Sequence, residues 1–186
     1  WARSFAEQVP ESLWSATFYP EPEAPAYVGK LVADGVEVFK VHVQVGEFHL
    51  DDPLLDGVWG QLEDAGTPVV VHAGSGPVGN AFTGPDPLER VLRRHPRLRV
   101  IVAHMGHPFE ELLMNYMRKW STLYLSCTAY APKYIDANLV KFMNTKTYRG
   151  RVLWGSDEPW FPMRRSLEEA KALPLDDEAM ALFLGG

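Results

Sequence analysis

The sequence predicts an α/β fold in which helices wind a parallel sheet, and two observations carry this prediction. Short apolar runs rich in β-branched residues alternate with longer amphipathic segments along the 186 residues, as is typical of strands buried on both faces and joined by crossover helices. The midpoints of successive runs lie about 23 to 31 residues apart, which matches one strand–helix unit. An open doubly wound sheet and a closed barrel both fit this pattern.

Six segments are predicted as strands, and the first of them has the weakest pattern. In chain order they are Leu13–Tyr19, Val36–Val43, Val69–His72, Arg99–His104, Leu123–Ser126 and Arg151–Trp154. Helices are predicted between and after the strands, and several begin with proline or an acidic residue, as helix starts tend to. The predicted helices are Pro22–Ala33, Pro53–Asp64, Asp86–His95, Pro108–Trp120, Tyr134–Asn144, Met163–Ala172 and Asp176–Leu184.

Composition indicates one globular domain over residues 1–186. Hydrophobic residues make up 46% of the chain, which is enough for one core. The single cysteine, Cys127, excludes an internal disulfide and fits a reducing, cytoplasmic setting. No run reaches the roughly 18 apolar residues of a membrane span, and the N-terminal residues lack the pattern of a signal peptide. We therefore expect a cytoplasmic protein without a membrane partner.

Charge and motifs argue against nucleic-acid and nucleotide binding. With 18 basic and 24 acidic residues the net charge is −6, and no basic cluster with interleaved aromatic residues occurs. No glycine-rich dinucleotide motif follows a predicted strand. The loop of small residues after His72 lets a ligand approach, but it lacks the lysine of a phosphate-binding loop.

The length of the chain conflicts with a complete eight-stranded barrel. Such a barrel needs about 250 residues and rarely fewer than roughly 200, whereas the 186 residues here supply six units. The sequence also begins without a methionine and stops at Leu-Gly-Gly. We therefore expect either an open sheet or a barrel whose N-terminal strands and extreme C-terminus are missing.

Three polar residues stand where predicted strands end. His72 ends the run VVVH, His104 ends VIVAH, and Asp157 follows VLWGS. In parallel barrels the C-terminal strand ends meet at a mouth that carries the active site, and imidazole with carboxylate is the usual ligand set of a catalytic zinc or related divalent ion. Each residue alone is also typical of an ordinary polar strand end. Together the three predict a metal-dependent site.

Two further residues are expected inside the barrel. Lys40 and His42 have the same parity on Val36–Val43, so both are predicted to face the interior, where either supports a metal or a substrate anion. A carbamylated Lys40 that bridges two metals is a weaker alternative. His95 ends a basic helix and is predicted to be solvated surface.

Two residues in the loops at the mouth are candidates for substrate binding. His107 lies in the loop after His104, where contact with substrate and helix capping are equally compatible with its position. Trp160 follows Asp157 by three positions, which predicts either an aromatic wall over the mouth or simple loop packing.

Four motifs taken together resemble the amidohydrolase superfamily. They are VFKVH, PVVVHAG, VIVAHMG and VLWGSDEP, in that order. The nearest likeness is the amidohydrolase-related group that contains aminocarboxymuconate semialdehyde decarboxylase and the resorcylate decarboxylases, and the resemblance covers essentially the whole chain. It implies a distorted (β/α)8 TIM barrel of which the third to eighth strands are present.

The resemblance also implies a role for each residue at the mouth. His72 resembles the metal ligand of the fifth strand, His104 the acid/base of the sixth, and Asp157 the metal-binding carboxylate of the eighth. One divalent metal ion is implied, zinc in the first place and manganese in the second. The sequence departs from the family pattern in one respect, because the His-x-His pair of the first strand does not occur in it.

Three functions are compatible with the resemblance. The first is hydrolysis of a small carbonyl substrate by a metal-activated water, with His104 or Asp157 as the base. The alternatives are a metal-dependent non-oxidative decarboxylation of a small aromatic or unsaturated acid, and a degenerate barrel without catalysis. A small-molecule substrate is expected, and a homodimer is allowed. Substrate selection is expected in the loops at residues 75–85 and 127–133.

Overall fold

The computed structural model of the chain describes residues 1–9, 11–74 and 80–185. Six strands within these ranges form one sheet in which all neighbours are parallel. They are β1 (Ser15–Ala16), β2 (Val38–Val41), β3 (Val69–Val71), β4 (Val100–Val102), β5 (Leu123–Cys127) and β6 (Val152–Trp154). The helices are α1 (Ala2–Ala6), α2 (Ala24–Ala33), α3 (Val43–Gly46), α4 (Asp56–Ala65), α5 (Asp86–Arg94), α6 (Glu110–Lys119), α7 (Ala137–Met143), α8 (Met163–Lys171) and α9 (Asp177–Phe183), with 3-10 turns η1 (Pro53–Leu55), η2 (Ala103–Gly106) and η3 (Pro132–Tyr134).

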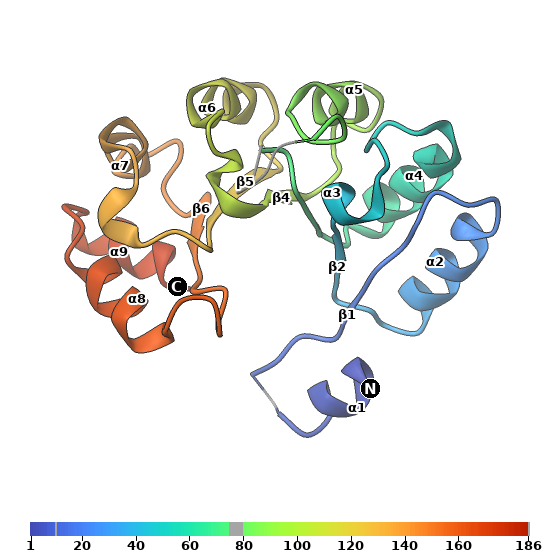
Figure 1. Ribbon diagram of the computed structural model, residues 1–186, viewed down its shortest axis with the longest axis horizontal. Coiled ribbons are helices and arrows are strands. Elements are labelled where there is room, and N and C mark those ends of the chain that lie inside the picture. The colour runs from blue at the N-terminus through green and yellow to red at the C-terminus, as the bar shows by residue number, and fades with distance from the viewer. Residues whose placement is uncertain (10, 75–79, 186) are drawn as a thin grey trace.

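The order of the strands identifies the sheet as the wall of a barrel. Crossovers that step from each strand to the next in one direction place every connecting helix on the same face, whereas a doubly wound sheet reverses its strand order and is covered on both faces. The order β1-β2-β3-β4-β5-β6 contains no reversal. Accordingly, the helices follow the outer side of a curved sheet (Figure 1).

Alternation along the strands separates an outer face from an inner face. Outward residues pair across the sheet in two layers and are at most 1% exposed: Phe39, Val69, Val100 and Leu123, then Val41, Val71, Val102 and Leu125. Burial of one such side chain contributes about 1.5–3 kcal/mol, so these layers hold the helices to the sheet. The inward residues of the register between them are less buried: Lys40, Val70, Ile101 and Tyr124.

Two strands end two residues before their predicted limits, and both end at a histidine-bearing turn. After β2, His42 caps the short α3, and its Nδ1 accepts a hydrogen bond from Val45 N at 3.4 Å. After β4, His104 and Met105 take left-handed φ angles of 91° and 47° within η2. Strained backbone of this kind clusters at functional sites. The turns therefore mark the C-terminal edge of the sheet as the place to look for chemistry.

The main helices agree with the predicted segments to within a few residues, because local chemistry sets their ends. Asp136 caps α7 by accepting hydrogen bonds from the backbone of Asn138 and Leu139, and Asp176 caps α9 in the same manner. At the other end, α4 stops at Gly66 with a φ of 67°, a left-handed cap that favours glycine. None of the helices in the described ranges is long and apolar enough to cross a membrane.

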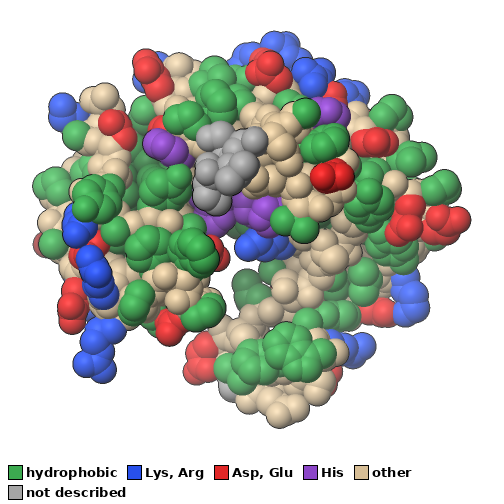
Figure 2. Space-filling view, viewed as in Figure 1, with side chains coloured by type: hydrophobic (Ala, Val, Ile, Leu, Met, Phe, Trp, Pro, Cys, Tyr) green, Lys and Arg blue, Asp and Glu red, His purple; other side chains and the backbone are tan. Residues whose placement is uncertain are grey.

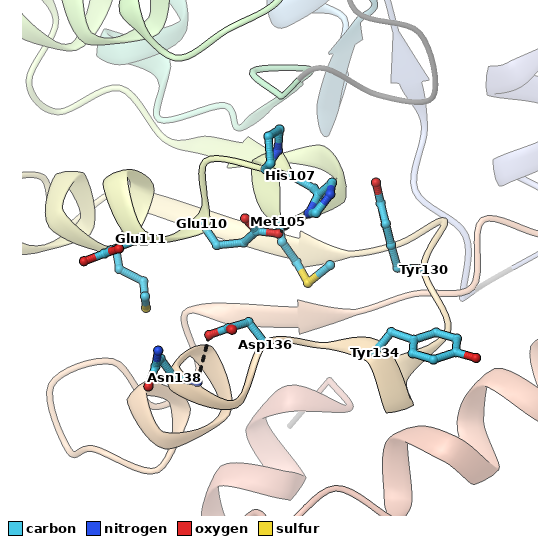
Figure 3. A pocket seen from close by; sticks show the side chains of 10 residues that line it. Met105, His107, Glu110, Glu111, Tyr130, Tyr134, Asp136 and Asn138 are labelled. Carbon is cyan, nitrogen blue, oxygen red and sulfur yellow. Dashed lines mark hydrogen bonds and ion pairs between the residues drawn. The ribbon is translucent and has the colours of Figure 1, made fainter.

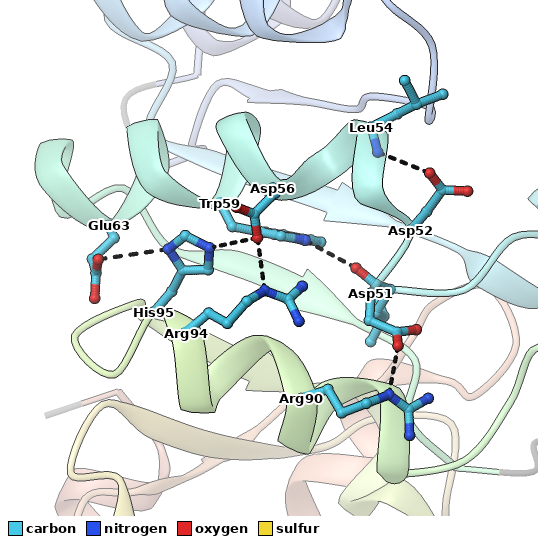
Figure 4. Close-up of polar contacts among 10 residues, drawn as sticks. Asp51, Asp52, Leu54, Asp56, Trp59, Glu63, Arg90, Arg94 and His95 are labelled. Carbon is cyan, nitrogen blue, oxygen red and sulfur yellow. Dashed lines mark hydrogen bonds and ion pairs between the residues drawn. The ribbon is translucent and has the colours of Figure 1, made fainter.

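His95 is buried between two helices, so the prediction that it is solvated surface is wrong. It is 9% exposed, and its Nε2 lies 3.2 Å from Asp56 Oδ1 while its Nδ1 lies 3.7 Å from Glu63 Oε2. Arg94 also bonds Asp56, at 2.7 Å, as Figure 4 shows. The local sequence holds no signal for this cluster, because both carboxylates lie on α4 whereas His95 follows α5.

Candidate active site

Two histidines meet at the C-terminal edge of the sheet. His72 directly follows β3 and His104 lies in η2 after β4, and their Nε2 atoms are 3.0 Å apart. Figure 2 shows histidine side chains gathered at the hollow of the molecule, with a basic side chain next to them. The structure thus brings together two of the three residues predicted to form the site.

Backbone carbonyls favour one tautomer of each ring. His72 Nδ1 lies 3.4 Å from the Val41 carbonyl oxygen, and His104 Nδ1 lies 3.1 Å from the Thr128 carbonyl oxygen. A carbonyl oxygen only accepts hydrogen bonds, so both rings donate from Nδ1 and both neutral Nε2 atoms keep a lone pair. Two lone pairs at 3.0 Å repel each other unless a proton or a cation is shared between them. The pair is therefore arranged to accept a cation.

Burial keeps both imidazoles neutral. His72 is 8% exposed, and burial, followed by the charges of His42 and His104, lowers its pKa to about 3. Burial also lowers the pKa of His104, although the Thr128 carbonyl and the charge of Asp157 act in the opposite direction. Both rings are therefore neutral at pH 7. Neutral imidazole is the form that binds metals and accepts protons.

His42 and Lys40 extend the site along β2. The His42 ring stacks on the His72 ring, with centroids 3.8 Å apart and planes inclined by 26°. Lys40 lies two residues earlier on the inner face, and its side chain is exposed. After burial, the charge of Lys40 is a further cause that lowers the pKa values of His42, His72 and His104. The predicted inward position of both residues is confirmed, and Lys40 brings positive charge to the mouth.

Asp157 lies in the loop after β6, near the histidine pair but not in contact with it. Its side chain is exposed and its backbone has a left-handed φ of 62°. Within the part of the chain that the structure describes, no hydrogen bond or ion pair joins its carboxylate to His72 or His104. Its charge nevertheless acts to raise the pKa values of His104 and His42. Asp157 therefore influences the pair through space.

Gly74 allows the loops that follow β3 and β4 to touch. A Cβ atom at this position would lie 2.4 Å from the carbonyl carbon of Gly106 and 2.5 Å from the carbonyl oxygen of His107. Gly74, one of the small residues after His72, thus allows the backbone of this loop to approach the backbone of Gly106 and His107. This role is separate from the predicted approach of a ligand. Residues 75–79, which belong to the predicted selectivity loop 75–85, lie outside the described residues.

His107 and Tyr130 separate the histidine pair from a neighbouring cavity. A cavity of about 10 Å³ lies between these two residues, His72 and His104, and holds room for one water or ion. A second cavity of about 480 Å³ lies on the far side of His107 and Tyr130 (Figure 3). His107 Nδ1 is 2.6 Å from Glu110 Oε1, and its ring centroid is 5.3 Å from that of Tyr130. The wider cavity is thus beside the pair rather than over it.

The two residues predicted to bind substrate differ in their surroundings. His107 borders the pair, Phe109 occupies the N-cap position of α6, and His107 Nδ1 contacts the side chain of Glu110 in the first turn of that helix. Trp160 is 74% exposed in the loop after β6, which does not fit simple loop packing. Substrate contact by either residue stays a prediction.

The donors at the mouth fit a divalent cation in part. His72 Nε2 has a lone pair free of backbone bonds, and imidazole nitrogen with carboxylate oxygen suits zinc and similar ions. Among the described residues, however, no group of three or more His, Cys, Asp or Glu side chains lies close enough to hold a metal ion. The described chain therefore supplies some of the donors that such a site needs.

Thr128 belongs to the site but was not identified from the sequence. Its hydroxyl oxygen lies 2.7 Å from His104 Nδ1, in addition to the carbonyl contact. Thr128 follows β5 directly and has the parity of Ser126, whose Oγ lies 3.4 Å from Thr128 Oγ1. The signal that points to it is this inward parity carried one step past the strand end.

Comparison with solved structures shows a TIM-barrel fold. The chain matches an uncharacterised TIM-barrel protein from Bordetella bronchiseptica with a TM-score of 0.87 and 24% identity, over 100% of this chain and 68% of that one. A 2,6-dihydroxybenzoate decarboxylase from Rhizobium matches with a TM-score of 0.74 and 17% identity, over 98% and 71%. A 5-carboxyvanillate decarboxylase from Novosphingobium aromaticivorans, complexed with manganese and 4-hydroxy-3-methoxy-5-nitrobenzoic acid, matches with a TM-score of 0.74 and 14% identity, over 98% and 64%. The predicted barrel, represented here by six strands, is confirmed.

Sequence comparison identifies the family. Comparison with curated proteins gave no significant match. The model of the family described as amidohydrolase, in contrast, matches residues 2–186. With a match over nearly the whole chain, a barrel wall of parallel strands and histidines at the strand ends, this chain belongs to the amidohydrolase family.

Proposed function

We propose that this chain forms the catalytic part of a metal-dependent hydrolase that acts on a small carbonyl compound bearing a carboxylate. One observation carries the proposal: the Nε2 atoms of His72 and His104 lie 3.0 Å apart. The Nδ1 atom of each ring contacts a backbone carbonyl oxygen on the other side. A metal ion held by His72 Nε2 would relieve the repulsion between the two lone pairs, and the family to which the chain belongs supports a metal ion in that role.

His72 and Asp157 are the residues that would hold the metal. At pH 7 His72 needs no deprotonation before it binds, because its pKa is about 3. Zinc is the first choice for nitrogen and oxygen donors, and manganese is the second, as bound by the Novosphingobium aromaticivorans decarboxylase. When bound, a divalent ion supplies a Lewis acid that polarises a carbonyl group and makes a bound water more acidic.

His104 is suited to act as the general base. Its Nε2 is free to take a proton from an attacking water, because its Nδ1 already donates to the Thr128 carbonyl. That carbonyl also stabilises the positive charge that the ring gains when the proton arrives. His104 then holds the proton at Nε2 and can return it to the leaving oxygen or nitrogen. Hydrolysis of an ester, lactone or amide follows from these steps.

Lys40 defines the charge of the substrate. Its exposed ammonium group faces the inner side of the sheet, and no carboxylate among the described residues forms an ion pair with it. A positive charge at the edge of a hollow attracts anionic ligands into it. A carboxylate on the substrate would therefore bind beside the histidines.

Non-oxidative decarboxylation is the second candidate. Two proteins with this fold are decarboxylases of aromatic acids, 2,6-dihydroxybenzoate and 5-carboxyvanillate. In that reaction Lys40 would hold the carboxylate that leaves, and His104 would deliver a proton to carbon rather than accept one from water. The neutral form of His104 favours hydrolysis, because a base must be unprotonated at the start of the reaction.

Metal binding tests the proposal. We expect zinc or manganese to raise the melting temperature of metal-free protein, since binding at 100 times the Kd stabilises by about 2.7 kcal/mol. His72→Asn should abolish this rise, whereas His95→Asn, a substitution at another buried histidine, should retain it. Equal responses of the two variants, or no metal bound by the wild-type protein, would contradict the proposal.

Product analysis separates the two reactions. Carboxylated lactones and esters should be hydrolysed with release of acid, and hydroxylated aromatic acids should release carbon dioxide only if decarboxylation is the true activity. Lys40→Met should raise KM for the carboxylated substrate and leave an uncharged ester of similar size unaffected. If Lys40→Met changes both substrates equally, Lys40 does not select the charge.

A further inference from the structure

Thr128 contacts His104 through two oxygen atoms. The carbonyl oxygen lies 3.1 Å and the hydroxyl oxygen 2.7 Å from the same atom, His104 Nδ1. One N–H group can donate to two acceptors at once, and the carbonyl can act only as an acceptor. The Thr128 hydroxyl oxygen in turn accepts a hydrogen bond from Ser126 Oγ at 3.4 Å. Thr128 thus contacts the His104 ring at Nδ1, on the side opposite to Nε2.

These two contacts matter because the backbone of His104 does not by itself define the orientation of the ring. His104 leaves β4 with a φ of 91° inside a 3-10 turn, so it lacks the regular neighbours that fix a side chain within a strand. Its ring is half-buried, and the contacts of its two nitrogen atoms are to Thr128 and His72. Loss of the shorter contact would let the ring rotate and exchange its two nitrogen atoms.

Gly155 leaves the space that Thr128 occupies. A Cβ atom at Gly155 would lie 2.5 Å from Thr128 Cγ2, closer than real Cβ contacts come, and 3.9 Å from Thr128 Cβ. Gly155 is in the loop after β6, two residues before Asp157. The loop that carries the candidate carboxylate therefore packs directly against the residue that orients the candidate base.

We propose that Thr128 is the positioning residue that holds His104 with Nδ1 protonated and Nε2 directed at His72, and that Gly155 provides the room for it. The catalytic meaning of this arrangement rests on the proposed role of His104 as base. The orientation of the ring does not, and it can be measured without turnover.

Thr128→Val tests the hydroxyl, because valine keeps the shape, the Cγ methyl group and the backbone carbonyl. We expect kcat to fall about tenfold with KM within twofold, as for loss of one hydrogen bond. The ring ¹⁵N NMR signals of His104 in metal-free protein should shift towards a mixture of the two tautomers. Thr128→Ser keeps the hydroxyl and should retain both the wild-type kcat and the wild-type ¹⁵N signals.

Gly155→Ala gives a second test that does not touch Thr128 itself. Its methyl group meets Thr128 Cγ2, so Gly155→Ala should reproduce the kcat loss and the ¹⁵N shift of Thr128→Val. Combining it with Thr128→Ser removes Cγ2 and keeps the hydroxyl, so the double variant should recover both readouts. Combining it with Thr128→Val should give no recovery, because valine keeps a methyl group at that place.

Two results would overturn the inference. One is a Thr128→Val protein with the ¹⁵N signals and kcat of the wild type. The other is a Gly155→Ala/Thr128→Ser protein whose ¹⁵N signals stay shifted although it is folded by circular dichroism. If no protein of the series turns over any substrate, the proposed hydrolase function fails, and the ¹⁵N signals alone decide whether Thr128 positions the ring.

Discussion

His72 and His95 are both buried histidines, 8% and 9% exposed, but their surroundings are opposite in kind. His95 lies on the outer side of the sheet between two carboxylates, Asp56 and Glu63 (Figure 4). His72 lies at the inner mouth, stacked on His42 and facing the lone pair of another imidazole. Each nitrogen of His95 thus lies near a carboxylate oxygen, whereas the reactive nitrogen of His72 faces the nitrogen of another imidazole.

The difference teaches how to distinguish a structural histidine from a functional one. A buried polar group normally has its hydrogen bonds satisfied by the protein, and His95 meets this rule through contacts that tie α4 to the end of α5. His72 meets it only on one side, at the Val41 carbonyl. A buried ring with an unsatisfied side directed at a cavity indicates a place where an ion or substrate completes the set.

The largest expected effect separates the two regions by activity. His104→Asn removes the proposed base and should lower kcat about 10²- to 10⁴-fold, the usual contribution of a positioned acid/base. His95→Asn should change kcat less than threefold, since its ring contacts no group at the mouth. Steady-state kinetics on folded protein of matched concentration measure both. Comparable losses in the two variants would erase the distinction between the regions.

The second expected effect is on stability as a function of pH. In the metal-free protein His72 has a pKa of about 3 against 6.5 when unfolded, so between these values the unfolded state binds the additional proton. Stability is therefore complete above pH 6.5 and falls as the pH drops towards 3, by about 1.4 kcal/mol per pH unit for this group. Burial lowers the pKa of His104 as well, which adds to the same trend.

Urea unfolding of metal-free protein at pH 7, 5.5 and 4 measures this slope. His72→Gln removes the titrating group and should flatten the dependence, whereas His95→Gln should lower stability without flattening it to the same extent. A slope that is identical in wild type and His72→Gln would show that the buried imidazole is not the cause.

The third expected effect is a loss of stability without a loss of function. His95→Phe fills the space but removes the hydrogen bond from the ring to Asp56. Asp56 keeps its contact with Arg94, and Glu63 keeps its contact with Arg97. Loss of one hydrogen bond costs about 0.5–1.5 kcal/mol, which urea unfolding at pH 7 will measure. His49→Phe, at an exposed position, is the control and should stay within about 0.5 kcal/mol. An unchanged His95→Phe protein would mean that the ion pairs are dispensable.

The smallest expected effect concerns Trp160, which belongs to neither histidine cluster. Its indole is 74% exposed, so Trp160→Ala should change the free energy of unfolding by less than about 0.5 kcal/mol. If it forms a wall for substrate, KM should rise severalfold while kcat stays constant. An unchanged KM would remove Trp160 from the substrate-binding residues and confine that role to His107.

The sequence by itself determined the elements and the residues at their ends. The apolar runs predicted that His72 stands at the end of β3. The alternation of side chains along a strand predicted that Lys40 and His42 face inward, because this alternation is a local property. Shared strand ends then brought His72 and His104 to the same edge. The single domain over residues 1–186, the cytoplasmic location, the lack of nucleic-acid and membrane partners and the homodimer stay predictions.

Only the tertiary structure decided which side chains touch. Thr128 and His104 are 24 positions apart, and His95 and Asp56 are 39 apart, so no local period connects them. Their contacts depend on loop conformations that are set by close approaches such as that of Gly74 to Gly106. Such approaches follow from the packing of whole βα units against one another, and packing selects among loop shapes that the local sequence leaves equally open.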